Sequence, residues 1–316
     1  MRNFLPELIR EFRWLVHSRT ALALAFAAVV MAIWGAVSGA TTSVSAIAAF
    51  QATLARYRAN GEDITGALNS PASVEGSADQ QVISNPLRYD LDQAALALTQ
   101  LDPLGAISST LSLCALFMFP IIGFVLGIFV STHDYKSGSL AFRWPRSGAV
   151  AFAASKPVAL LLAMGALAVL TAALAVPAAW IARLTLAEAS NEIAAFAVAG
   201  PSAAHAFAIG ALSVLTGTAG AATGLLIGAL TRNRTFTVAA FSVGFLLIPL
   251  LGIADPRNLI TVAGRDLLYF VGQFRPRPLG DFDPLAAAVV LAAIAVVSVG
   301  LSVIPWLARS RTERRS

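Results

Sequence analysis

The sequence predicts an all-α integral membrane protein with six transmembrane helices, an N-terminal interfacial amphipathic helix and a helical extracytoplasmic loop. The first observation is composition. Of the 316 residues, 57% are hydrophobic and 12% are charged, whereas soluble globular proteins have roughly 45–50% and about 25%. The second is a mean hydropathy of +0.75. So few charges cannot cover a soluble surface, which excludes a soluble enzyme, a disordered scaffold and a nucleic-acid-binding protein.

Six apolar stretches are long enough to cross a bilayer, which takes about 20 helical residues. They are Thr20–Ser38, Ala106–Val130, Pro157–Ile181, Ala206–Leu230, Thr235–Ile253 and Leu285–Ala308. Helices are expected because every backbone group in lipid must find its hydrogen bond within its own segment. The six stretches contain no Asp, Glu, Lys or Arg, which argues against a proton relay in the membrane.

The basic residues predict the orientation. Of the 22 Lys and Arg residues, 14 lie in segments 1–19, 131–156, 232–234 and 309–316, which alternate with the other connecting segments. The positive-inside rule places these four segments in the cytoplasm. Both termini are therefore expected there, with a six-helix domain over residues 20–308 and a cytoplasmic tail over 309–316. The net charge of +5 reflects this topology, and no nucleic-acid partner is expected.

Residues 1–19 carry apolar side chains at helical spacing, with charged residues mainly between them. The apolar residues are Phe4, Leu5, Leu8, Phe12, Leu15 and Val16. This pattern predicts an amphipathic helix that is too polar to span the membrane and lies along its cytoplasmic surface.

Two connecting segments on the extracytoplasmic side are expected to contain helices. Residues 39–105 form an insertion with helical patterns before residue 61 and after residue 89, separated by a stretch typical of a loop. We expect its helices to pack on top of the bundle. Residues 255–284 contain the half-apolar run Leu259–Val271, which is too short to span and suits a re-entrant or interfacial helix.

Sequence motifs of common enzymes and nucleotide-binding proteins are missing. There is no Gly-x-x-x-x-Gly-Lys-[Ser/Thr], His-Glu-x-x-His, Cys-x-x-Cys or Gly-x-Ser-x-Gly. His17, His133 and His205 lie in different segments, and Cys114 is the single cysteine. We therefore expect no catalytic residue, no metal site and no cofactor on this chain.

The fourth stretch contains four closely spaced glycines, Gly217, Gly220, Gly224 and Gly228. Small residues at every fourth position let another helix approach closely. We expect these glycines to pack against a helix of the same bundle in preference to forming a dedicated dimer face.

The cytoplasmic loop 131–156 carries the most informative pattern. An acid, a Gly-Ser turn, a short helical piece, a Pro-Arg-Ser break and a lysine before the third span follow one another. These residues are Asp134, Gly138, Ser139, Pro145, Arg146, Ser147 and Lys156. With this loop, the layout of interfacial helix, six spans and half-inserted segment resembles the permease subunits of ABC-2-type ABC transporters. Asp134 stands where that family usually has Glu.

The resemblance implies a permease subunit of a bacterial ABC exporter in the plasma membrane. It implies an ABC ATP-binding partner that carries ATP and Mg²⁺, and a second permease copy, either identical or related. It also implies that loop 131–156 couples to the ATPase, with Lys136, Arg143 and Arg146 able to pair with its acids. Two other classes remain open from the sequence: an ion-coupled secondary transporter and a membrane-embedded enzyme or assembly factor.

Overall fold

The computed structural model describes residues 4–75, 82–136, 139, 143, 146–187, 193, 196, 198–231, 233, 235, 237–239, 241, 255–271 and 276–312. Their helices are α1 (Phe4–His17), α2 (Thr20–Asn60), α3 (Ile64–Asn69), α4 (Pro86–Thr99), α5 (Pro103–Leu116), α6 (Met118–Lys136), α8 (Ala149–Leu184), α10 (Ala203–Thr231), α12 (Pro256–Ala263) and α13 (Pro284–Thr312). The strands β1 (Val74–Glu75) and β2 (Val82–Ile83) form an antiparallel pair in which Val74 faces Ile83.

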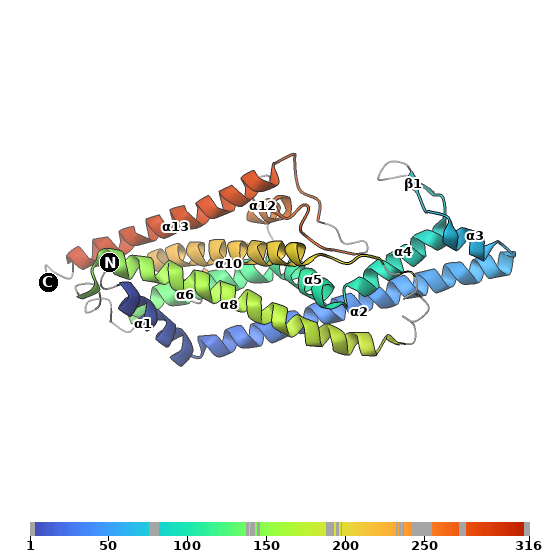
Figure 1. Ribbon diagram of the computed structural model, residues 1–316. Coiled ribbons are helices and arrows are strands. Elements are labelled where there is room, and N and C mark those ends of the chain that lie inside the picture. Colours follow the sequence, from blue (N-terminus) through green and yellow to red (C-terminus); the bar gives the residue numbers. More distant parts are fainter. Residues whose placement is uncertain are drawn as a thin grey trace.

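The molecule is an elongated helical bundle. Within the described residues, five helices are long and apolar enough to cross a membrane: α2, α6, α8, α10 and α13. The chain is therefore a helical, multi-pass membrane protein, as the composition predicts. Helix α1 and the C-terminal end of α13 lie at the same end of the bundle (Figure 1). We call this the α1 end, and the opposite end, beyond which α2 projects with α3 and α4, the distal end.

Helix α2 is much longer than the predicted span Thr20–Ser38. Its 41 residues extend over about 61 Å at 1.5 Å per residue, roughly twice the thickness of a hydrocarbon core. The helix continues to Gly61, which ends it in the left-handed conformation at φ 69°. The helical pattern expected in the first part of insertion 39–105 is therefore continuous with the helix of the first predicted span.

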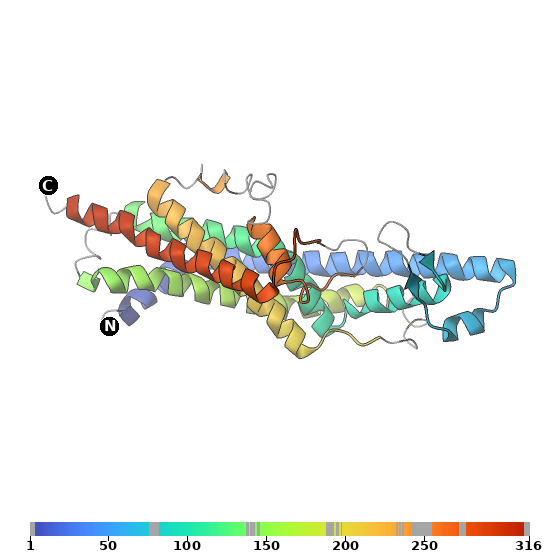
Figure 2. The ribbon, with the colours of Figure 1, turned by 90° about the horizontal axis from the view of Figure 1, so that it is seen from above.

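The second half of α2 forms a helical hairpin with α4 that projects beyond the bundle (Figures 1 and 2). Its apolar core includes Ile47 and Phe50 of α2 and Leu87 and Leu91 of α4. This arrangement differs from the expected packing on top of the bundle, because the insertion buries its own apolar side chains. The segment between the two helices is also more ordered than a loop, since it contains α3 and the β1–β2 pair.

The predicted second span, Ala106–Val130, is two helices in the structure. Helix α5 ends at Leu116 and α6 begins at Met118, with Phe117 between them outside helical geometry at φ −124°. Pro120 explains the break, because proline has no N–H to donate to residue 116 and its ring crowds that carbonyl group. The second predicted span is therefore interrupted next to Pro120.

Helices α6 and α10 approach each other closely through glycines from both. A Cβ atom on Gly123 of α6 would lie 2.0 Å from the carbonyl oxygen of Gly217, and one on Gly127 would lie 2.0 Å from that of Ala221. From the other side, a Cβ on Gly220 or Gly224 would lie 2.3 or 2.1 Å from the carbonyl oxygen of Pro120 or Phe124. Only glycine allows this backbone contact.

The predicted helix Leu259–Val271 has different bounds. Helix α12 covers Pro256–Ala263, where Asp255 caps its N-terminus by accepting the N–H of Arg257, and Gly264 ends it. Aspartate followed by proline is a strong helix-start signal. The chain then turns at residues 264–267 and continues without helix through residue 271.

The remaining predicted spans fall partly inside the described residues. Pro157–Ile181, Ala206–Leu230 and Leu285–Ala308 lie within α8, α10 and α13. The fifth, Thr235–Ile253, lies largely outside the described residues.

Candidate functional site at the α1 end

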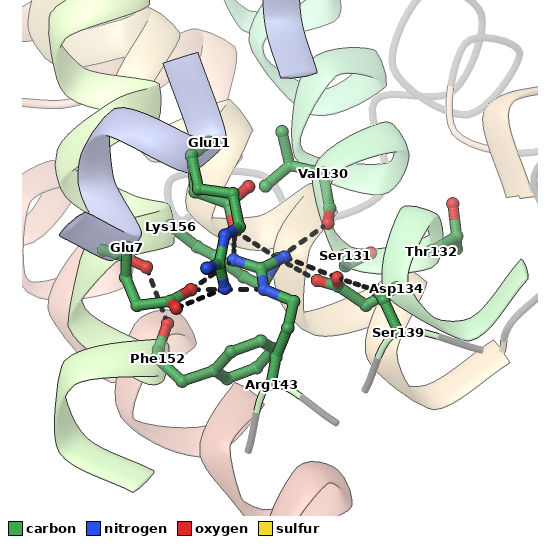
Figure 3. A network of polar contacts seen from close by, with 12 residues as sticks. Glu7, Glu11, Val130, Ser131, Thr132, Asp134, Ser139, Arg143, Phe152 and Lys156 are labelled. Carbon is green, nitrogen blue, oxygen red and sulfur yellow. Dashed lines mark hydrogen bonds and ion pairs between the residues drawn. The ribbon is translucent and has the colours of Figure 1, made fainter. Parts of the chain in front are cut away.

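Five charged side chains from four parts of the chain meet inside the α1 end. They are Glu7 and Glu11 of α1, Asp134 of α6, Arg143 of the loop between α6 and α8, and Lys156 of α8, and we call them the charge cluster (Figure 3). Each has at most 7% of its surface exposed. Buried charges are rare in proteins unless they are paired, so this grouping needs a specific arrangement.

The turn between α1 and α2 positions the two glutamates. Arg19 adopts the left-handed conformation at φ 63°, which costs a non-glycine residue roughly 1 kcal/mol, and it lets α1 fold back on the bundle. Glu7, Glu11 and Leu15 are then buried, as expected for residues four apart on one helix face. The ring of Trp14 stacks on that of His133 in α6 at 4.4 Å between centroids.

Arg143 is the centre of the charge cluster. Its Nη2 donates to Glu7 Oε2 and to Glu11 Oε1, both at 2.6 Å, and its Nη1 donates to Asp134 Oδ1 at 2.5 Å. The backbone N–H of Arg143 donates to the carbonyl oxygen of Ser139 at 2.9 Å. The hydroxyl of Ser147 donates to the carbonyl oxygen of Arg143 at 2.5 Å.

Lys156 completes the charge cluster from α8. Its Nζ donates to Asp134 Oδ2 at 2.5 Å, to Glu11 Oε1 at 3.1 Å and to the carbonyl oxygen of Val130 at 3.2 Å. Asp134 also accepts a hydrogen bond from the hydroxyl of Ser139 at 2.6 Å. Asp134 Oδ1 is therefore bonded to Arg143 and Oδ2 to Lys156.

Two aromatic side chains, Phe152 and Trp306, lie beside the two cations. The ring of Phe152 is 5.1 Å from Arg143 Cζ and 4.9 Å from Lys156 Nζ, within the range of a favourable cation–π contact. The edge of Trp306 in α13 packs against Phe152 with centroids 5.6 Å apart. Through these rings the charge cluster also contacts the last helix of the bundle.

The charges inside the charge cluster do not balance. Three carboxylates face two buried cations, and Glu11 Oε2 is buried with no hydrogen-bond partner among the described residues. Arg10 supplies a third cation from the rim, where its half-exposed side chain donates to Glu7 Oε1 at 2.7 Å. Burial opposes the charge of Arg143, but the carboxylates of Asp134 and Glu11 outweigh it and raise the pKa of Arg143 above its ordinary value.

The structure brings together three residues of the loop pattern: Asp134, Ser139 and Lys156. Arg143, which was expected to pair with acids of an ATPase, forms its ion pairs with Glu7, Glu11 and Asp134 of its own chain. Arg146 is exposed, Lys136 is the last residue of α6, and Gly138 and Pro145 lie outside the described residues.

The glycines chosen from the fourth stretch lie on α10. Gly220, Gly224 and Gly228 face α6, and Gly217 lies between Met164 of α8 and Phe119 of α6.

Sequence reasoning missed the roles of Glu7 and Glu11. A signal exists, because they are acids four residues apart in an otherwise basic segment, on the same helix face as Leu15. Within the described residues, no group of three His, Cys, Asp or Glu is placed to hold a metal ion. The chemistry of the charge cluster is therefore that of a salt-bridged joint between α1, the α6–α8 loop and α8.

Compared with known proteins, the chain matches no protein-family model, no curated protein and no solved structure. The function proposed below therefore rests on the sequence pattern and on the geometry of the charge cluster.

Proposed function

We propose that the chain is the permease subunit of an ABC-2-type ABC transporter, an exporter in the bacterial plasma membrane. The observation that carries the proposal is the convergence of Asp134, Ser139, Arg143 and Lys156. Asp134, Ser139 and Lys156 belong to the sequence pattern that resembles the coupling loop of that family, and Arg143 lies within the same loop. A loop that only joins two membrane helices does not need the five buried, ion-paired residues of the charge cluster.

The arrangement of the helices supports six crossings with both termini on the cytoplasmic side. Helix α10 ends at the α1 end, since Gly228 contacts Ser131 near the end of α6. Helix α12 ends nearer the distal end, where Gly264 lies near Leu212 in the first half of α10. Six crossings therefore require that the apolar stretch Thr235–Ile253 returns the chain across the membrane, and the basic residues of loop 131–156 favour a cytoplasmic position for the α1 end.

A mechanism follows from the joint. An ATP-binding subunit docked on the α6–α8 loop moves when it binds and hydrolyses ATP. Arg143 ties that loop to α1, and its partner Asp134 is in turn held by Lys156 of α8. Movement of the loop is therefore transmitted to α1, α6 and α8 together, since the charge cluster resists separation of its members. This rigid transmission is what alternating access requires of a coupling element.

The partners follow from the same proposal. ATP and Mg²⁺ belong to the ATP-binding subunit, because this chain has no phosphate-binding loop of the Gly-x-x-x-x-Gly-Lys type. A second permease, identical or related, completes the path through the lipid bilayer.

The proposal requires that a neighbouring reading frame encodes a P-loop ATPase, and it is tested by purifying the chain together with that ATPase. We expect a stable complex that hydrolyses ATP, and no ATP binding by the isolated chain. Transport by the isolated chain, driven by a proton or sodium gradient alone, would instead identify an ion-coupled carrier. Turnover of a substrate by the isolated chain would identify a membrane-embedded enzyme.

A further inference from the structure

A cavity of about 370 Å³ lies at the distal end, between α4 and the chain that follows α12. Gln93 and Leu96 of α4 form one side. Arg265, Leu268, Tyr269 and Phe270 form the other. The volume falls in the range of pockets that hold small molecules.

Four described residues with polar side chains line this cavity: Gln93, Thr261, Arg265 and Tyr269. The hydroxyls of Thr261 and Tyr269 form hydrogen bonds within the protein. Within the described part of the chain, the guanidinium of Arg265 forms no ion pair and the side chain of Gln93 forms no hydrogen bond. None of the described lining residues is acidic. Asp102, which lies near Tyr269, is paired with Arg183, and Asp266 follows Arg265 in the chain without lining the cavity. The polar side of the cavity is therefore suited to an anion.

The rest of the lining is apolar. Leu96, Leu268 and Phe270 present aliphatic and aromatic surface, and each is only partly buried by the protein itself. A ligand that fills the cavity would cover this surface, which favours binding by about 25 cal/mol per Å² of apolar area. An anion without an apolar part would leave it uncovered.

Hydrogen bonds hold the walls in place. The hydroxyl of Tyr269 lies 2.5 Å from that of Thr99 in α4, and its backbone N–H donates to Ser112 Oγ in α5 at 2.9 Å. Asn258 exchanges two hydrogen bonds with the backbone of Leu279, at 3.2 and 2.7 Å. The cavity is thus formed before any ligand arrives, which lowers the cost of binding.

We propose that this cavity binds an amphiphile with one anionic group, which lies against Arg265 and Gln93 while its apolar part packs on Leu96, Leu268 and Phe270. The anion is a carboxylate, phosphate or sulfate, since all three accept hydrogen bonds from guanidinium and amide groups. The source is either a lipid of the bilayer or a free molecule of the same chemistry. The proposal concerns binding to the chain alone and does not depend on an ATPase partner.

The probe is dodecanoate that carries a photoreactive diazirine on its alkyl chain. It is added to the full chain in phosphatidylcholine nanodiscs, and the labelled residues are located by mass spectrometry. We expect labels on Leu96, Leu268 and Phe270 that excess unlabelled dodecanoate removes. Arg265→Gln should lower this labelling about tenfold, whereas Arg277→Gln, an exposed arginine between two lining prolines, should change it less than twofold. Leu96→Trp, which fills the cavity, should abolish it.

Three results would overturn the proposal: equal labelling by the corresponding dodecanol, equal losses in Arg265→Gln and Arg277→Gln, or labels confined to the membrane-facing surface of α2 and α13. Nanodiscs that also contain phosphatidylglycerol distinguish the two sources. Competition by this lipid for the Arg265-dependent label assigns the site to a bilayer lipid. Undiminished labelling assigns it to a free amphiphile.

Discussion

Arg143 donates two hydrogen bonds to the same carboxylate oxygen of Glu7, at 2.6 and 3.1 Å, although the two residues are 136 positions apart in the sequence. This contact joins the α6–α8 loop to a helix that precedes the first span. Both side chains are buried, so water cannot replace either partner when the other is lost. The contact is therefore a structural constraint on the loop and more than a surface ion pair.

Replacing Arg143 by glutamine should destabilise the α1 end strongly. Three carboxylates would then face Lys156 alone inside the protein, and breaking a buried ion pair costs about 3–5 kcal/mol. We expect a lower unfolding midpoint in detergent and faster trypsin cleavage after Arg13 as α1 detaches. The matched control is Arg146→Gln in the same loop, where the side chain is exposed. Equal behaviour of the two variants would show that α1 is held by other contacts.

Replacing a carboxylate of the charge cluster by its amide should destabilise the protein more at Asp134 than at Glu11. Asp134 uses both oxygens to bind cations, so Asp134→Asn must turn an N–H₂ group toward Lys156 or Arg143 and should cost about 3 kcal/mol or more. Glu11 binds both cations through Oε1 alone, and Glu11→Gln can keep that acceptor. Its cost should be about 1 kcal/mol. The thermal unfolding midpoints of the two variants show which one loses more stability. A larger loss in Glu11→Gln would contradict the assigned hydrogen bonds.

The contact between α6 and α10 predicts that alanine substitution affects stability very differently at two glycines. Gly224→Ala would place a Cβ 2.1 Å from the carbonyl oxygen of Phe124, and separating the helices should cost about 1–3 kcal/mol. Gly165→Ala, in the middle of α8, would meet no atom within 4 Å. It should be neutral or stabilise by up to about 1 kcal/mol, because alanine favours helix over glycine. Unfolding midpoints in detergent test the pair, and equal losses would refute the close approach.

The orientation can be tested by cysteine labelling in a Cys114→Ala background. The 14 basic residues in alternate segments predict that the α1 end lies in the cytoplasm. An impermeant maleimide should therefore label Asn60→Cys at the tip of α2 in intact cells. It should reach Arg13→Cys on α1 only after the membrane is permeabilised. The reverse result would invert the topology.

Within the described residues, apolar length predicted where the long apolar helices lie but not where they end. The hydropathy of α2 falls after Ser38, yet nothing in the next 22 residues stops a helix, and the chain continues until Gly61. Conversely, Pro120 lies inside an uninterrupted apolar stretch and still separates α5 from α6. Helix ends follow local backbone chemistry, whereas span predictions follow hydropathy averaged over many residues.

Only part of the charge cluster could be predicted from the sequence. The loop pattern identified Asp134 and Lys156, and Arg143 was expected to pair with acids of an ATPase. The periodicity of α1 predicted two faces without showing which one faces the bundle. In water the apolar face would turn inward. Lipid is as apolar as leucine, so exposing Leu5 and Val16 costs little beside a bilayer, and the acidic face can turn toward the buried cations.

The central claim is that an ATP-binding subunit docks on the α6–α8 loop, and photo-cross-linking from that loop tests it most directly. Benzoylphenylalanine in place of Arg146, an exposed loop residue at the α1 end, should cross-link to the ATPase in the purified complex. The same residue in place of Arg58, exposed near the tip of α2, should give no such product. A cross-link from position 58, or none from position 146 in a complex that still hydrolyses ATP, would contradict the proposed function of this loop.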